Sequence, residues 1–304
     1  MAVNLSQIRD LLLPGLRAVV GKYEQIPTQW DKVFKKVNSK LAFERTAMMR
    51  YLGYAQLKTE GGQTAFDNGA GERFIYNQEH NEIALGYAIT RKAVDDNLYK
   101  TQFHPSNLGL IQSFAQTKEI YGASILNTAN VYNTAVGGDG VSLINTAHPI
   151  DGQTIANRPS VDVDLNEATL LNGMIAIRTN FRDQAGLKVF ARGEKLIIPP
   201  QLEPIAIRLM KTELRPGTAD NDVNAILSTA GGLKEGYLVM DFLTSSYAWF
   251  LLTNIPGLLY MDRVPFETDM QVDFVTDNLL VKGYSRYSFG YSDWRAIWGT
   301  FPTS

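Results

Sequence analysis

The spacing of apolar residues changes character four times along the 304-residue chain, and it divides the chain into five segments. Residues 1–55 show little periodicity, although a helix from Ser6 to Leu13 is expected within them. A segment of this kind cannot build a core of its own. Trp30 and Phe34 must therefore be covered by the rest of the chain or by a neighbour, and we expect an extended arm with short helices.

Residues 56–90 are rich in glycine and then alternate between apolar and polar positions. Gly61-Gly62 indicates a turn. The runs Arg73–Gln78 and Asn81–Thr90 carry aromatic residues at partial two-residue spacing, which is typical of strands. We expect these two runs to pair as a long, polar β-hairpin. A hairpin with so little apolar content is unstable alone and must lie on another surface.

Residues 91–135 have a helical pattern. Arg91–Lys100 is expected to form a short helix that ends at His104-Pro105, after which Ser106 can cap a second helix. Leu110, Phe114, Tyr121 and Ile125 would share one face of it. If this helix continues to Asn130, it is about 37 Å long at 1.5 Å per residue.

The remainder of the chain predicts an α/β lobe followed by strands. The expected elements of the lobe are helices at Leu165–Phe181 and Leu202–Lys211 and strands at Lys195–Ile198, Tyr237–Phe242 and Trp249–Thr253. Residues 261–304 return to alternation and end in Trp294 and Trp298. These last strands need a sheet to join. We expect a discontinuous domain in which the long helix and the terminal strands flank an inserted lobe.

The composition of the chain excludes several classes of function and of site. The formal net charge is −2, so tight or sequence-specific DNA binding, which needs a basic surface, is not expected beyond weak contact. The absence of cysteine excludes disulfides, thiolate metal sites and cysteine nucleophiles. No apolar run approaches the roughly 18 residues that span a membrane.

The residues with potential chemistry form no catalytic pattern. His80, His104 and His148 lie far apart and fit no zinc motif, and Gly137–Gly140 lacks the spacing of a phosphate-binding loop. We expect no catalytic residue, no metal and no cofactor. The aromatic C-terminal region leaves open a glycan- or base-stacking surface, although its two-residue alternation favours a core. The expected arm, hairpin and long helix cannot all bury their apolar residues within one chain. This favours a subunit of an obligate assembly.

Several segments resemble the major head subunit family of Mu-like phages. They are collinear in the second half of the chain: SLINTAHPI at Ser142–Ile150, KLIIPPQLE at Lys195–Glu203, LRPGTADN at Leu214–Asn221, SYAWFLL at Ser246–Leu252 and FGYSDWR at Phe289–Arg295. The first 140 residues match mainly in their layout.

This resemblance implies an α+β chain with the Hong Kong 97-type fold of tailed-phage major capsid proteins. It places an N-terminal arm at about 1–55 and an extended hairpin, the E-loop, at about 56–90. It implies a peripheral domain with a long spine helix at 91–140 and 258–304, and an axial domain at 141–257. The E-loop is expected to lie over the spine helix of a neighbouring subunit.

The resemblance also implies the partners. They are copies of the same chain in hexamers and pentamers of an icosahedral shell around double-stranded DNA, with a separate scaffold, a portal and decoration proteins. Assembly is expected in the host cytoplasm and the product in the virion. A cargo-holding compartment of the encapsulin type is the alternative. Candidate assembly contacts are Gly61, Gly62, Phe66, Asn68, Arg73, Tyr76, Trp30 and Phe34.

Overall fold

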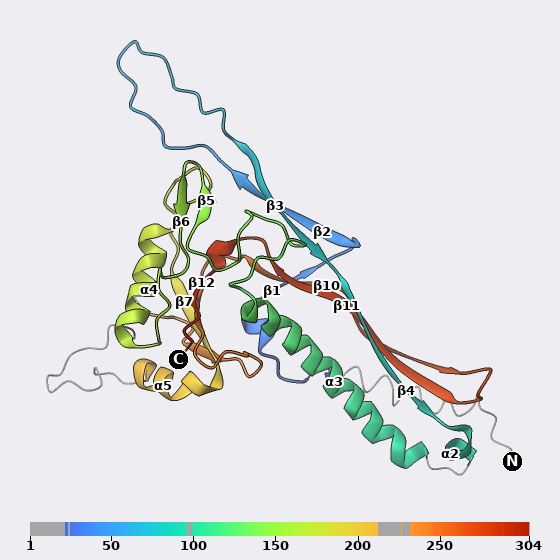
Figure 1. Cartoon of the computed structure of the whole chain (residues 1–304). Helices are drawn as coiled ribbons and strands as arrows, with labels where there is room; N and C mark the ends of the chain where they lie inside the picture. Colours follow the sequence, from blue (N-terminus) through green and yellow to red (C-terminus); the bar gives the residue numbers. More distant parts are fainter. Residues whose placement is uncertain (1–21, 24, 96–98, 212–225, 227–231, 304) are drawn as a thin grey trace.

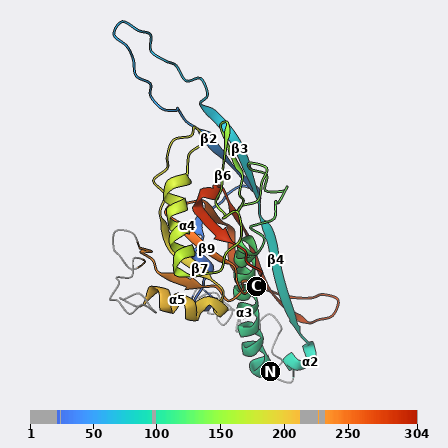
Figure 2. The ribbon, with the colours of Figure 1, turned by 60° about the vertical axis from the view of Figure 1, so that its left-hand side comes forward.

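The computed structural model describes residues 22–23, 25–95, 99–211, 226 and 232–303. The molecule is elongated (Figures 1 and 2). A hairpin projects from one end, a long helix and a sheet run to the other, and an α/β lobe lies beside them. The helix expected at Ser6–Leu13 and the segment Leu214–Asn221 lie outside the described residues.

A four-stranded sheet forms the long axis, in the order β1-β10-β11-β4. β1 is parallel to β10, and the other neighbours are antiparallel. The alternation of the C-terminal segment predicted its strands correctly, because β11 buries every second side chain from Leu279 to Tyr287. The four strands are β1 (Lys35–Asn38), β10 (Leu258–Val272), β11 (Leu279–Tyr291) and β4 (Asn81–Ile89).

The long helix α3 (Tyr99–Asn127) covers one face of this sheet, after the short helix α2 (Arg91–Asp95). The rings of Phe114 on α3 and Phe266 on β10 lie 4.8 Å apart. The predicted break at His104-Pro105 is wrong, because α3 passes through Pro105. Proline there removes one hydrogen bond of the helical ladder, and the packing of a 29-residue helix compensates for that loss. Of the predicted apolar face, Tyr121 remains 40% exposed.

The hairpin is built from other strands than the sequence suggested. β2 (Phe43–Arg50) pairs with β3 (Gly71–Glu79), and β4 pairs with β11 instead of β3. The predicted pairing of Arg73–Gln78 with Asn81–Thr90 is therefore wrong. Only His80 separates β3 from β4, and one residue is too short to reverse an antiparallel pair.

The α/β lobe has a second four-stranded sheet, in the order β12-β9-β7-β8. All five elements predicted for this region are confirmed to within a few residues. In the KLIIPP run the strand ends where the prolines begin. The elements are α4 (Glu167–Asn180), β7 (Gly193–Ile198), η2 (Pro200–Leu202), α5 (Glu203–Met210), β8 (Tyr237–Val239), β9 (Trp249–Thr253) and β12 (Ile297–Thr300).

One continuous core joins the lobe to the base of the long sheet. The chain returns to the lobe at its C-terminal end, where η3 (Trp294–Ala296) leads into β12, so this part of the predicted peripheral segment 258–304 pairs with the lobe. The short hairpin β5 (His148–Ile150) and β6 (Gln153–Ile155) lies beside the projecting hairpin (Figure 1). Within the described residues, no helix is both long and apolar enough to cross a bilayer.

Candidate assembly surfaces

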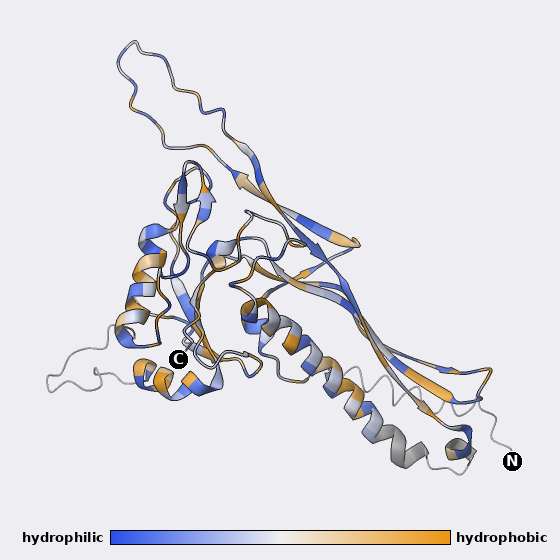
Figure 3. Ribbon diagram, in the orientation of Figure 1, coloured by the Kyte–Doolittle hydropathy of each residue, from blue (hydrophilic) through white to orange (hydrophobic). Residues whose placement is uncertain are grey.

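The projecting hairpin exposes apolar side chains that its own chain does not cover. The loop between β2 and β3, residues 51–70, extends away from the body in both views (Figures 1 and 2). Colouring by hydropathy shows apolar positions interspersed with polar ones along it (Figure 3). Leu57 is fully exposed and Phe66 is 86% exposed, and Tyr51, Leu52 and Tyr54 are more than half exposed. Surface of this kind marks a contact site.

A single carboxylate ties the two limbs of this loop together. Asp67 accepts hydrogen bonds from the backbone N–H of Gly53, at 2.7 Å, and of Gly69, at 2.8 Å. Arg50 at the end of β2 donates to Asp67 and also binds Asp151 in the β5–β6 turn, at 3.0 Å. These backbone hydrogen bonds, with Arg50, lower the pKa of Asp67. Together, these contacts of Asp67 and Arg50 set the direction of the loop relative to the lobe.

The structure separates the candidate contact residues into two groups. Tyr76, Trp30 and Phe34 are 1%, 8% and 3% exposed and lie in the core of their own chain. Trp30 and Phe34 pack on Phe289 of β11, and Tyr76 packs on Tyr291 of the same strand. The other five candidates lie on the hairpin, and all but the half-buried Gly62 are exposed: Gly61, Gly62, Phe66, Asn68 and Arg73.

At its far end, the long sheet leaves one face open. Small residues of β4, Gly86 and Ala88, lie beside Leu280 and Lys282 of β11 and form a hollow of about 470 Å³ with mainly apolar walls. α3 packs on the opposite face, where Phe114 approaches Gly283. Sequence periodicity could not identify this surface, because alternation predicts two faces and does not say which one stays open.

A second hollow, of about 600 Å³, lies at the base of the hairpin. Its walls come from the hairpin (Phe43, Arg45, Glu79) and from α3 and the loop that follows it (Tyr121, Asn133). The base of the hairpin is therefore not packed tightly against the helix.

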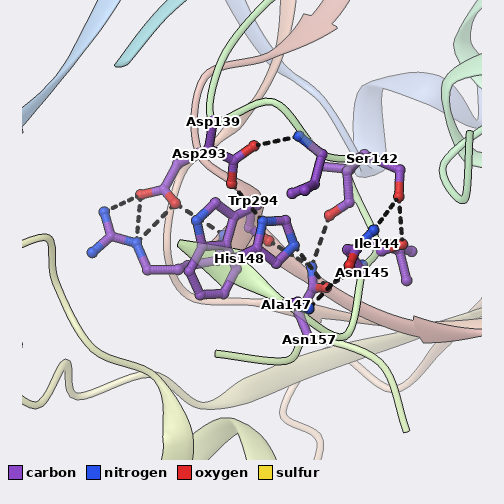
Figure 4. A network of polar contacts seen from close by, with 12 residues as sticks. Asp139, Ser142, Ile144, Asn145, Ala147, His148, Asn157, Asp293 and Trp294 are labelled. Carbon is purple, nitrogen blue, oxygen red and sulfur yellow. Dashed lines mark hydrogen bonds and ion pairs between the residues drawn. The ribbon is translucent and has the colours of Figure 1, made fainter. Parts of the chain in front are cut away.

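A buried polar network connects the loop after α3 to the C-terminal turn (Figure 4). His148 stacks on Trp294 with ring centroids 4.2 Å apart, and its Nδ1 lies 2.6 Å from Asp139. The side-chain amide of Asn157 donates to three backbone carbonyls, those of Leu143, Trp294 and Ile297. His148 of the SLINTAHPI segment and Asn157, which follows that segment, thus hold the lobe together, a role that the sequence alone did not reveal.

Two arrangements resemble parts of a hydrolase site, and both are closed to substrate. The Asp139–His148 pair has the geometry of an acid–base pair, but His148 is completely buried. His80 lies 3.0 Å from the hydroxyl of Ser288, and both residues are less than 5% exposed. Within the described ranges, no cluster of three or more metal-ligating side chains occurs. Both arrangements are buried contacts between side chains of the same chain.

The arm is fastened to α3 by a charged pair of neighbouring residues. Glu119 accepts hydrogen bonds from the backbone N–H of Gln29, at 2.7 Å, and of Trp30. The Lys118 ammonium lies within 5.4 Å of four ring centres, those of Tyr23, Trp30, Tyr260 and Tyr287. Burial lowers the pKa of Lys118 to about 8, and the carboxylate of Asp262 opposes that shift.

Comparison with known proteins agrees with this architecture. A family model described as "Phage capsid protein" matches residues 81–299. The structure is similar to a chain of Mycobacterium phage Che8, with a TM-score of 0.53 and 10% identity over 90% of both chains. It is similar to a virus-like particle from Pyrococcus furiosus, with a TM-score of 0.50 and 11% identity over 94% of this chain and 97% of that one.

The capsid of bacteriophage JBD30 matches with a TM-score of 0.50 and 11% identity, over 92% of this chain and 66% of that one, so this chain spans just under two thirds of that subunit's length. No curated protein matches the sequence. The family match covers more than half of the chain, and it includes the long helix, most strands of both sheets and most of the lobe. The chain belongs to the phage capsid protein family and has the Hong Kong 97-type fold.

Proposed function

We propose that this chain is the major head subunit of a tailed phage of the Mu-like type, which assembles into hexamers and pentamers of an icosahedral shell around double-stranded DNA. The observation that carries the proposal is the projecting hairpin, because it holds exposed apolar side chains away from the body that could cover them. The collinear segments SLINTAHPI, KLIIPPQLE and FGYSDWR support the Mu-like assignment.

The hairpin loop of one copy is the natural occupant of the open sheet face of another. Loop and hollow lie at opposite ends of the molecule, so a chain cannot fill its own hollow (Figure 1). Lys58 and Glu60 of the loop can complement Asp269 and Lys282 at the hollow. A contact between two different surfaces is head-to-tail, and such contacts form rings when the rotation between neighbouring copies closes. This placement differs from the expected one over the spine helix, which covers the other face.

The expected division into domains becomes a proposal with adjusted limits. The E-loop is best assigned to β2, β3 and the loop between them, because these strands pair with each other. The peripheral domain then consists of the long sheet with α3. The axial domain is the α/β lobe with β12, which pairs with β9.

The remaining partners follow from this role. Scaffold, portal and decoration proteins are proposed as separate chains, and assembly is placed in the host cytoplasm. Weak contact with packaged DNA is assigned to four exposed lysines, Lys32, Lys35, Lys36 and Lys40. We assign no enzymatic activity, cofactor or metal to the chain.

A cargo compartment of the encapsulin type is the second candidate, and the likeness to the Pyrococcus furiosus virus-like particle favours it. The two roles predict different neighbours in the genome. Terminase and portal genes support the phage head, whereas an adjacent gene for a cargo enzyme supports the compartment.

Electron microscopy of the overexpressed chain, with and without scaffold, tests assembly. We expect closed particles from the wild type. The double variant Leu57→Ser/Phe66→Ser and the hollow variant Ala88→Arg should remain folded and form none, while Thr64→Ser in the same loop should behave as wild type. Normal particles from both defective variants would contradict the proposed contact, and a wild type without particles in every condition would contradict the shell.

A further inference from the structure

The two strands of the projecting hairpin, β2 and β3, connect to the long sheet at the same place. β1 ends at Asn38 and the chain passes through Ser39 into β2, while β3 passes through His80 into β4. Ser39 still bonds to β10, through its N–H to the carbonyl of Asp262 at 2.9 Å. The joint between hairpin and sheet therefore consists of a short link at Ser39 and a single residue, His80.

One imidazole ring ties this joint together. His80 Nε2 lies 2.9 Å from the hydroxyl of Ser39, and Nδ1 lies 3.0 Å from the hydroxyl of Ser288 on β11. Ser39 in turn donates to Glu44 on β2, at 2.6 Å, and accepts from the N–H of Leu41. His80, Ser39 and Ser288 are each less than 7% exposed.

The hydrogen bonds fix the direction of the protons. Since the Ser39 hydroxyl gives its proton to Glu44, it can only accept from His80, so Nε2 carries the ring proton. Nδ1 is then the acceptor of the Ser288 hydroxyl. The closed joint thus uses the neutral ring. A second ring proton on Nδ1 would force the Ser288 hydroxyl to turn its own proton away and lose this bond.

The surrounding charges also disfavour the second proton. Arg286 on β11 and Arg263 on β10 are the positive charges that act on the ring, and Glu44 on β2 is the opposing carboxylate. Arg286 lies 3.8 Å from Glu82 on β4, and Lys36 on β1 pairs with Asp262 at 2.9 Å, so nearby opposite charges are already engaged. Burial and the two arginines lower the pKa of His80, and Glu44 opposes them.

We propose that His80, Ser39 and Ser288 form a pH-sensitive lock on the joint between hairpin and sheet, which is closed when the imidazole is neutral and opens when it is protonated. The hollow of about 600 Å³ beside the joint gives the hairpin base room to shift. Because the pKa is lowered in the closed state, closure is favoured above the ordinary histidine pKa of about 6.5 and weakens as the pH falls below it. The lock acts within one subunit and does not depend on the proposed assembly.

The absence of cysteine allows a direct test, since introduced thiols are the only ones in the chain. Spin labels at Gln63→Cys in the loop and Gln112→Cys on α3 report the distance between hairpin and body, with labelled full chains diluted into unlabelled ones. We expect this distance distribution to shift or broaden between pH 7.5 and pH 5.5. His80→Gln, which can donate to Ser39 and accept from Ser288, should abolish the response.

Two controls separate the lock from general acid effects. A second label pair, Gln112→Cys with Asn172→Cys on α4, should give the same distances at both pH values. Hydrogen exchange of peptides covering residues 39–44 and 77–82 detects opening too small for the labels. After correction for the intrinsic pH dependence of amide exchange, the protection of these peptides should fall at pH 5.5 in the wild type alone. Identical pH responses in wild type and His80→Gln, or no response by either method, would overturn the proposal.

Discussion

The lobe and the projecting hairpin use their large apolar residues in opposite ways. Trp249, Trp294 and Phe250 of the lobe are completely buried, whereas Leu57 and Phe66 of the hairpin loop are almost fully exposed. The lobe therefore gains its stability within one chain. The hairpin exposes comparable apolar area to solvent. The free energy of burying that area is therefore gained only when another molecule covers it. Variants in the two regions should separate folding from assembly.

The largest loss of stability is expected in the lobe. Trp294→Ala removes the ring that stacks on His148 and packs edge-on against Phe181, with centroids 5.4 Å apart. A cavity of this size costs about 3–5 kcal/mol of the free energy of unfolding, measured by denaturant titration of the subunit. The matched control is Phe190→Ala, since that ring is 88% exposed and its loss should cost less than about 0.5 kcal/mol. Equal losses in both variants would remove the contrast between core and surface.

A somewhat smaller loss is expected from the polar network. Asn157→Leu leaves three backbone carbonyls and the N–H of Asn145 without their side-chain partner. Unsatisfied buried groups of this kind cost about 2–3 kcal/mol. Asn172→Leu on the exposed side of α4 serves as the control, and its unfolding midpoint should hardly change. A midpoint for Asn157→Leu that matches this control would show that the network is not needed for the fold.

Lys118, whose ammonium lies among the rings of Tyr23, Trp30, Tyr260 and Tyr287, should give a pH-dependent effect of intermediate size. The pKa of Lys118 is about 8 in the folded chain and about 10.4 when unfolded, so the unfolded state binds more protons between these values. Stability then rises with pH across that window. Relative to Lys118→Met, the wild type should gain about 1 kcal/mol per pH unit from pH 8 to 9.5. Parallel stability curves for the two proteins would mean that burial does not lower the pKa of Lys118 in the folded chain.

The sequence predicted correctly those elements whose pattern of apolar and polar residues has a single physical cause. KLIIPP gives a buried strand and its end, and Leu170, Met174 and Ile177 give the buried face of α4. The pairing of the hairpin was missed because β2 buries only Met48 and so shows no one-sided pattern. The sequence also could not show whether Trp30 and Tyr76 are covered by their own chain, because that depends on contacts with distant strands. The open sheet face and the His80 joint depend on the same long-range pairing.

The smallest effect on stability, with a clear effect on the hairpin, is expected from Arg50→Gln. Its ion pairs with Asp67 and Asp151 are largely at the surface, and such pairs contribute at most about 1 kcal/mol. Arg50 links the end of β2 both to the loop and to the β5–β6 turn, and no other side chain of the described residues is seen to do so. The Arg50→Gln change removes this link. Trypsin should therefore cut faster after the exposed Lys58, while the unfolding midpoint stays nearly constant. Arg73→Gln, in the same hairpin but without an ion pair among the described residues, should leave both unchanged, and equal cleavage rates in the two variants would mean that the loop keeps its direction without Arg50.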